Sequence, residues 1–263
     1  MTALVRDTRT LLRRSVRRMV RYPSLTVMLI ALPVVFLLLF VFVFGGTLGA
    51  GIAGGGGRAE YADYLAPGIL LVTIAGTAQG TAIAVAMDMT QGIIARFRTM
   101  AVPRTAVLGA HVVGSVLQTL VALAVVVAVA LAVGFRPTAG VLGWLGALGV
   151  LVLATLATTW LSVALGLKAR SVETASNTPM FLVLLPFLSS AFVPTDSLPG
   201  PLRWFADHQP FTSVTEALRG LLLGTPIGSS LLEAVLWCTA VAAVSAWWSL
   251  RLFTRERTEA AAH

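Results

Sequence analysis

Six runs of predominantly apolar residues constrain what this chain can fold into. A helix needs about 20 such residues to cross the hydrocarbon core of a bilayer. The runs cover approximately residues 24–44, 64–87, 105–133, 140–167, 178–193 and 229–250. The chain is 57% hydrophobic and only 11% charged, whereas a soluble domain is about 25% charged. We therefore predict an all-α integral membrane protein with six transmembrane helices.

Little of the chain lies outside these runs, so residues 1–263 are predicted to form a single transmembrane domain. Its parts are an N-terminal interfacial helix over residues 1–23, a six-helix membrane region over 24–253 and a cytoplasmic tail over 254–263. The fifth run is short and contains Pro179 and Pro186. Because proline breaks the hydrogen-bond ladder of a helix, we expect a kinked span there.

The basic residues predict the orientation, because Lys and Arg are retained on the cytoplasmic side of a membrane. With the amino terminus inside, 15 of the 19 Lys and Arg residues fall in cytoplasmic segments, and only Arg58, Arg136, Arg203 and Arg219 fall in external ones. We expect a multi-pass protein of the plasma membrane with both termini in the cytoplasm. This distribution accounts for the net charge of +8 without a nucleic-acid partner, since no basic stripe is interleaved with stacking aromatics.

The Arg-rich start of the chain has helical periodicity. On a helical wheel its apolar side chains fall on one side and most of its arginines on the other, and Pro23 ends the pattern near Tyr22. This predicts an amphipathic helix in the membrane interface. An Arg-rich tail that serves only as a topology signal is the alternative. The next apolar run exceeds the roughly 7–15 residues of a signal-peptide core, so we expect it to be a retained span.

Patterns typical of catalysis or metal binding are missing from the sequence. No stretch has the glycine and lysine spacing that cradles nucleotide phosphates, and the glycine-rich residues 49–58 are expected to form a flexible external loop. The three histidines have no metal-binding spacing with carboxylates or with Cys238, the single cysteine. No serine lies in a nucleophile-elbow pattern. We therefore predict no enzymatic activity, no metal and no cofactor in this chain.

A few polar residues lie inside the predicted spans. The ionisable ones are His111 near the inner end of the third span and Glu233 near the outer end of the sixth. An ionisable group in hydrocarbon is costly and is a functional hypothesis by default. The uncharged set either holds helices together or lines a pathway, and both readings stay open. The candidate pathway residues are His111, Gln79, Gln118 and Thr159.

The loop between the second and third spans, "DMTQGIIARFRTMAVPR" over residues 88–104, is basic and patterned. Ile93, Ile94 and Phe97 fall on one side of a short helix, whereas Arg96 and Arg98 present charge. Pro103 ends this element before the next span. The pattern favours a docking surface for a cytosolic partner. An ordinary positively charged inner loop would account for the arginines but not for the apolar residues, glycine and proline.

The external segment between the fifth and sixth spans combines prolines with a short helix. Residues 213–224, "SVTEALRGLLLG", have a helical pattern that Gly224 ends, and they are too short and too polar to span a membrane. A helix that re-enters the outer leaflet fits this pattern, with Trp204 and Phe205 at the interface. A plain surface loop is the alternative.

These two stretches carry a resemblance to a known family. The chain resembles permease subunits of type-2 ABC exporters, in the daunorubicin-resistance-like branch. The inner loop is similar to the family's Asp-x-x-x-Gly-x-x-x-Arg-x-Arg motif, and "AFVPTDSLPGPLRWFADHQPFTSVTEALRGLLLG" is similar to its external segment. One departure is that Ala110, His111 and Ser115 stand where members often have Gly-Arg and, four positions later, an acidic residue.

The resemblance implies a homodimer or heterodimer of six-span subunits bound to two cytosolic ABC ATPase subunits, which would hold the ATP and magnesium. The ATPase-coupling residues would be Asp88, Gly92, Arg96, Phe97, Arg98 and Pro103. The re-entrant segment would form the external gate, with Pro194, Leu198, Pro199, Pro210, Glu216 and Arg219.

The function implied is ATP-driven export of a small hydrophobic or amphipathic compound, such as an antibiotic or a lipid, by alternating access. Membrane lipids would surround the permease as partners. Export of a polysaccharide or lipid-linked glycan is an alternative that the same architecture serves. Three further alternatives belong to other classes, namely a passive channel, a membrane scaffold and an integral-membrane enzyme acting on lipids. The enzyme requires a catalytic cluster that the sequence does not provide.

Overall fold

The computed structural model describes residues 23–52, 57–90 and 104–260, and every regular element in those ranges is helical. The long helices are α2 (Pro23–Leu39), α4 (Gly57–Thr90), α6 (Arg104–Val133), α7 (Val141–Lys168) and α12 (Ser230–Ala260). Five described helices are long and apolar enough to cross a membrane. The prediction of an all-α, multi-pass membrane protein is confirmed at this level.

The first span is longer than predicted. Helix α2 continues through a π-helical turn, η1 (Phe40–Phe44), into α3 (Gly45–Ile52). The expected loop over residues 49–58 is therefore wrong in part, because residues 49–52 belong to α3 and residues 57–58 begin α4. Glycine is tolerated in such helices, since away from water the helix itself is what satisfies backbone N–H and C=O groups. The predicted interfacial helix over residues 1–23 lies almost entirely outside the described residues.

The fifth apolar run, residues 178–193, is broken more severely than the kinked span that its prolines predict. It contains α9 (Met180–Leu184) and the 3₁₀ turn η2 (Leu185–Leu188), and α8 (Val172–Asn177) directly precedes it. Pro179 directly precedes α9, and Pro186 lies in the first turn of η2. Proline lacks an N–H and clashes with the preceding turn, so neither position continues a regular α-helix. This run is the one predicted span that is not a single long helix.

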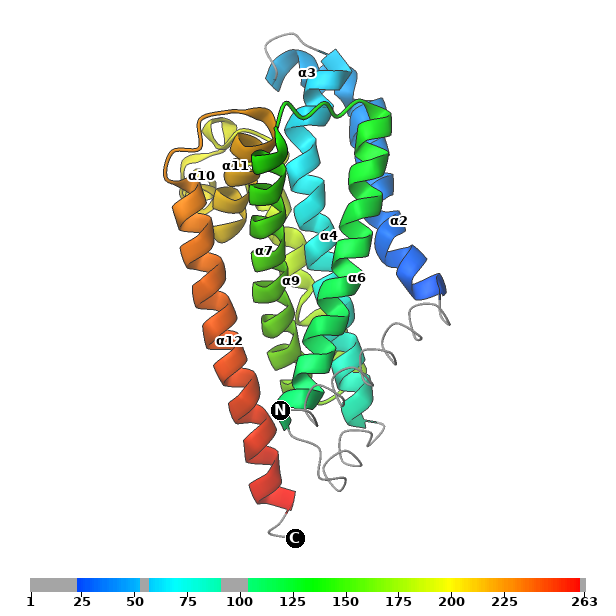
Figure 1. Cartoon of the computed structure of the whole chain (residues 1–263). Helices are drawn as coiled ribbons and strands as arrows, with labels where there is room; N and C mark the ends of the chain where they lie inside the picture. The colour runs from blue at the N-terminus through cyan, green and yellow to red at the C-terminus, as the bar shows by residue number, and fades with distance from the viewer. Residues whose placement is uncertain (1–22, 53–56, 91–103, 261–263) are drawn as a thin grey trace.

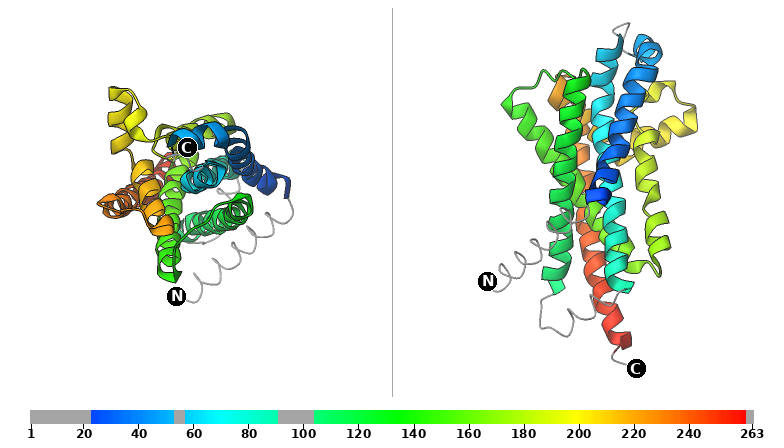
Figure 2. Two further views of the ribbon diagram at one scale, coloured as in Figure 1. Left: turned by 90° about the horizontal axis from the view of Figure 1, so that it is seen from above. Right: turned by 90° about the vertical axis from the view of Figure 1, so that its right-hand side faces the viewer.

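Helix α4 occupies the centre of the bundle (Figures 1 and 2). In its most apolar stretch 72% of the residues are buried, compared with 17% to 39% in the other four long helices. It packs against α2, α3, α6, α7, α8, α9 and α11. Its C-terminal end lies beside the start of α6 and near the end of α12, and we call this the inner end (Figure 1). The opposite end, with α3, is the outer end.

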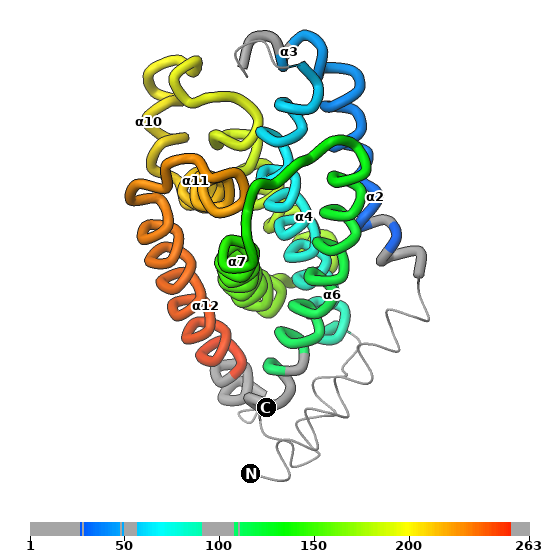
Figure 3. The backbone as a smooth tube through the Cα atoms, turned by 45° about the horizontal axis from the view of Figure 1, so that its top comes forward, coloured from blue at the N-terminus to red at the C-terminus, as the bar shows by residue number. Residues whose placement is uncertain are grey.

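Two further helices complete the outer end. They are α10 (Gly200–His208) and α11 (Pro210–Leu223), which follow the short turn η3 (Thr195–Ser197). Gly224 ends α11 in the left-handed conformation, with φ of 73°, as its position predicts. Helix α10 protrudes from the bundle (Figure 2). Helix α11 is largely buried and lies beside α7 and α12 (Figure 3).

Close packing of α7 on α4 depends on Gly166. A Cβ atom there would lie 2.7 Å from the carbonyl oxygen of Ala82 and 3.0 Å from Cβ of Val85, both on α4. A Cβ atom on Gly149, in the same helix, would meet nothing within 4 Å. The two glycines thus differ in packing but share the cost of a glycine in a helix interior.

Gly166→Ala should destabilise the protein by about 1–3 kcal/mol relative to Gly149→Ala, because a methyl group forced against helix backbone separates α7 from α4. Both substitutions gain the same helix propensity, so their difference reports packing. The measurement is the thermal midpoint of the detergent-purified protein. Equal midpoints for the two variants would show that α7 does not approach α4 this closely.

Candidate functional site

A contact between a histidine and a carboxylate joins α4 to α6 at the inner end. Nε2 of His111 lies 3.2 Å from Oδ2 of Asp88, and the two side chains are 19% and 8% exposed. Asp88 is two residues before the end of α4, and His111 is in the second turn of α6. The residues between these helices, 91–103, carry the predicted coupling motif. The pair therefore connects the two helices at the base of that segment.

Hydroxyl side chains continue the contact between α4 and α6 away from the inner end. Thr81 on α4 and Ser115 on α6 are hydrogen-bonded to each other, and both are buried. Oγ1 of Thr119 contacts Oγ1 of Thr77 at 2.9 Å and the carbonyl oxygen of Ser115 at 2.9 Å. Ser115 is one helical turn after His111, so these hydroxyl contacts, here called the hydroxyl seam, begin beside the His111–Asp88 contact and continue toward the middle of the helices. Such interhelical hydrogen bonds contribute about 0.6 kcal/mol each.

Arg219 forms the corresponding cluster at the outer end. Its side chain is only 6% exposed, and Nη1 donates to Oε1 of Glu216 at 2.8 Å. Nη2 donates to the carbonyl oxygens of Tyr64 at 3.0 Å and Ser190 at 2.7 Å. The guanidinium also lies over the ring of Tyr64, 3.7 Å from its centroid. One buried cation thus joins α11, α4 and the segment after η2.

A small residue allows this cluster to close. A Cβ atom on Gly68 would lie 2.6 Å from Cβ of Ala191, so only glycine lets the chain at residues 190–191 approach α4 this closely. The hydroxyl of Tyr64 donates to the carbonyl oxygen of Ser190 at 2.8 Å. Carbonyl groups of the broken fifth span therefore find donors in two side chains, which offsets the loss of regular helix there.

Gln209 and Glu233 make further hydrogen bonds that attach α11, and the residue directly before it, to neighbouring elements. Nε2 of Gln209 donates to the carbonyl oxygens of Leu185 at 3.0 Å and Leu188 at 2.8 Å. Glu233 on α12 accepts from the hydroxyl of Ser213 on α11 at 2.9 Å. Glu233 is also near the outer end of its helix, where the sequence predicted it, and it is exposed. The external segment is thus attached to the fifth span, α4 and α12.

The predicted external residues do not all join the Arg219 cluster. Glu216 and Arg219 do. Pro194 and Pro199 directly precede η3 and α10, Leu198 lies between those elements, and Pro210 begins α11. These four residues shape the segment rather than contribute to its polar core.

The predicted inner residues divide differently. Asp88 is paired with His111, which connects a predicted coupling residue to a predicted pathway residue. Gly92, Arg96, Phe97, Arg98 and Pro103 lie outside the described residues. The coupling role of that stretch stays a prediction.

The remaining pathway candidates are not gathered at one place. Gln79 donates from Nε2 to the carbonyl oxygen of Ser176 at 2.8 Å, which attaches α4 to α8. Thr159 is 1% exposed within α7, and Gln118 is half-buried in α6. Within the described ranges no hydrogen bond connects these three side chains to one another. For Gln79 the helix-packing reading describes the structure better than a pathway.

Sequence reasoning missed Tyr64 and the hydroxyl seam. Tyr64 begins the predicted second span, and nothing in its local pattern indicates an arginine 155 residues away. The seam had a visible signal, because Thr73, Thr77 and Thr81 repeat every four residues and therefore lie along one face of α4. A spacing of four identifies the face but not the helix that packs against it.

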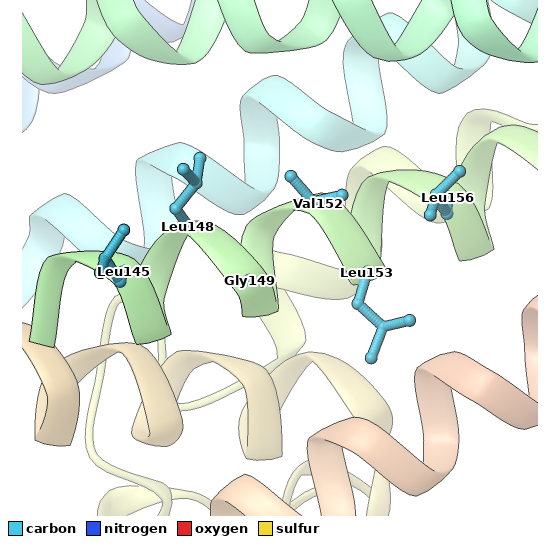
Figure 4. Close-up of a pocket in the computed structure, with 6 residues that line it drawn as sticks. All are labelled: Leu145, Leu148, Gly149, Val152, Leu153 and Leu156. Carbon is cyan, nitrogen blue, oxygen red and sulfur yellow. The ribbon is translucent and has the colours of Figure 1, made fainter. Parts of the chain in front are cut away.

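A shallow apolar groove runs along the outer half of α7. Its lining residues include Leu145, Leu148 and Gly149, and none of the predicted site residues contributes to it. Leu148 and Val152 point to one side of α7 and Leu153 to the other (Figure 4). Leu145 is 60% exposed, as expected for a leucine facing lipid in a membrane-spanning helix. The groove is part of the exposed apolar surface of the described chain.

Arg219→Ala should destabilise the protein by about 2–5 kcal/mol, because it removes a buried cation with several charge-assisted hydrogen bonds and leaves carbonyl groups without donors. Arg203 is the matched control, since it pairs with Asp196 and Asp207 but is 49% exposed. Arg203→Ala should change stability by less than about 1 kcal/mol. Thermal midpoints in the same detergent compare the two, and similar losses would contradict the cluster.

Asp88 and His111 should show energetic coupling. A double-mutant cycle with Asp88→Asn, His111→Gln and the double variant isolates their mutual interaction from the other contacts of each residue. We expect a coupling energy of about 0.5–3 kcal/mol, measured from thermal midpoints. Strictly additive losses would mean that the two side chains do not stabilise each other.

Comparisons with known proteins place these features in a family. The family model described as ABC-2 type transporter matches residues 6–223. The daunorubicin resistance ABC transporter permease protein DrrB1 of Streptomyces coeruleorubidus is 32% identical over 223 residues, which cover 84% of this chain and 76% of that protein. The probable doxorubicin resistance ABC transporter permease protein DrrC of Mycobacterium tuberculosis is 25% identical over 155 residues, covering 59% of this chain and 56% of that protein.

The matched residues include Asp88 and His111 at the inner end and Arg219 at the outer end. Permeases of this kind carry no ATPase activity, and ATP is bound by a partner subunit. The chain therefore belongs to the ABC-2 type transporters, as a multi-pass membrane permease related to drug-resistance exporters.

Proposed function

We propose that this permease moves a hydrophobic or amphipathic compound out of the cell by alternating access, driven by an ATPase subunit that docks on residues 91–103. Helix α4 is the observation that carries the proposal. It runs unbroken from Gly57 to Thr90, with Tyr64 in the outer cluster and Asp88 in the inner one. Their separation of 24 positions corresponds to about 36 Å of helix, close to the thickness of a bilayer.

A buried helix that runs from one end of the bundle to the other suits the transmission of movement between the two ends. Displacement of residues 91–103 by the ATPase would act on α4 and α6 together, because the Asp88–His111 pair joins them. The same helix contacts Arg219 at the outer end, so its movement would alter the position of α11. Packed cores and interfaces switch between discrete arrangements more readily than they deform continuously. We expect the inner and outer clusters to behave in this way, and alternating access requires such discrete states.

The orientation in this proposal has the inner end in the cytoplasm. Two cation–aromatic pairs support it, because Nζ of Lys168 lies 5.7 Å from the Trp248 ring and the guanidinium of Arg251 lies 4.3 Å from the Trp247 ring. Tryptophans occur at both membrane interfaces, whereas basic residues are retained on the cytoplasmic side, so Lys168 and Arg251 are the residues that favour this orientation. A second permease copy, identical or related, would complete the transport pathway in a complex of two permeases and two ATPases.

The substrate class rests on the relatives. Their names refer to daunorubicin and doxorubicin resistance, so amphipathic aromatic drugs are the first compounds to try. The test uses inside-out vesicles that contain the permease and its cognate ATPase, with daunorubicin accumulation followed after ATP addition. ATP-dependent accumulation supports the proposal. Stimulation of ATP hydrolysis by lipids alone, without drug accumulation, would redirect it to lipid export.

Arg98→Asp should leave the permease folded but lower ATPase association at least about tenfold, which corresponds to about 1.4 kcal/mol, because it reverses a charge in the proposed docking segment. Arg58→Asp is the control, since Arg58 is exposed at the outer end. Co-purification of the tagged permease with its ATPase measures both. Undiminished association of Arg98→Asp would exclude this residue from the docking surface.

A further inference from the structure

An apolar cavity of about 200 Å³ is lined in part by α11, and no residue of the Arg219 cluster lines it. Its walls come from five parts of the chain, namely α4, α7, the broken fifth span, α11 and α12. Leu71 and Ile74 of α4 form its floor, and each is only 1% exposed. Phe211 and Val214 of α11 line it next to the external segment. None of the polar contacts described above occupies this space.

The cavity opens toward the membrane. Phe181 on α9 and Trp237 on α12 line it, and they are 45% and 46% exposed. Helix α9 packs on α4, whereas α12 packs on α7 and α11, so the fifth and sixth spans diverge at this level. Both exposed rings lie in segments predicted to cross the bilayer. A lipid-facing opening between these spans therefore leads to buried residues of the central helix.

The residues that line the cavity favour a hydrocarbon ligand over a polar one. Thr158 has the one hydroxyl in the lining, and it already donates to the carbonyl oxygens of Ala154 at 2.9 Å and Thr155 at 3.2 Å. A polar group entering the cavity would lose its own hydrogen bonds without replacement. An apolar cavity of about 150 Å³ stays dry and binds benzene, so this slightly larger one has room for one ring or a short alkyl segment.

We propose that this cavity is a binding site for an alkyl chain that enters laterally from the membrane between α9 and α12. Burial of its methylene groups there is favourable relative to water but nearly neutral relative to lipid, so occupancy is exchangeable. The chain belongs either to a membrane phospholipid or to a free single-chain amphiphile. In both cases it contacts α11 directly. The site is independent of the export proposal and would exist in a permease that moved a different compound.

Photo-crosslinking tests the site in the full-length protein in phosphatidylcholine nanodiscs. One probe is phosphatidylcholine with a diazirine midway along an acyl chain, and the other is an alkyl maltoside with the same photoreactive chain. The readout is the adduct on Leu71 or Ile74, identified by mass spectrometry, because bulk lipid does not reach these residues unless the cavity is occupied.

Ala157→Leu fills the cavity, and its adduct yield should fall at least about fivefold, since Ala157 is buried and lines the space. Ala157→Val gives a smaller loss and carries the test if the leucine variant aggregates. Ala243→Leu, on the exposed face of α12, should leave the yield unchanged.

Adducts with the phospholipid probe assign the site to membrane lipid, and adducts with the maltoside alone assign it to free amphiphiles. Both results support the proposal. Two results overturn it, namely labelling confined to exposed residues with either probe, and equal labelling of α4 in Ala157→Leu and the wild type.

Discussion

The burial of α4 is the constraint on which the rest of this structure depends. Without water inside the bilayer, a chain must satisfy its backbone within helices, and side chains decide how closely those helices approach. Helix α4 is rich in alanine, glycine and threonine, and it is surrounded by other helices along most of its length. Close contacts such as those of Gly166 with Ala82 are possible because these residues are small. A central helix of bulky residues would force its neighbours apart.

Polar groups occur along α4 where they join it to neighbours. Asp88 meets His111 at the inner end, hydroxyl groups meet those of α6 along the middle, and Tyr64 meets Arg219 at the outer end. A buried arginine is costly, and here its donors reach several carbonyl groups and a carboxylate. The external segment is therefore fixed to the same helix that leads to the predicted coupling segment. The proposed transport mechanism depends on this connection, which runs through a single chain.

The apolar side of α11 has a different character. There α11 borders an apolar cavity that is also lined by two half-exposed rings, Phe181 and Trp237, whereas Arg219 of the same helix joins the polar cluster. One short helix thus contacts both the polar core of the outer end and the proposed alkyl-chain site. An occupant of the cavity and a movement of α4 would act on the same element. Such shared contact is the minimum that coupling between two sites requires.

The sequence by itself determined the membrane class, the approximate spans and the break in the fifth run, because these depend on composition and on local backbone chemistry. Run length, Pro179, Pro186 and the terminating Gly224 were sufficient for that. The family likeness also followed from two local motifs, and the comparisons confirmed the family. What only the tertiary structure decided is which polar residues meet. His111 pairs with Asp88 and Arg219 reaches Tyr64 because helices distant in sequence pack side by side, and a local pattern specifies a helix face but not its partner.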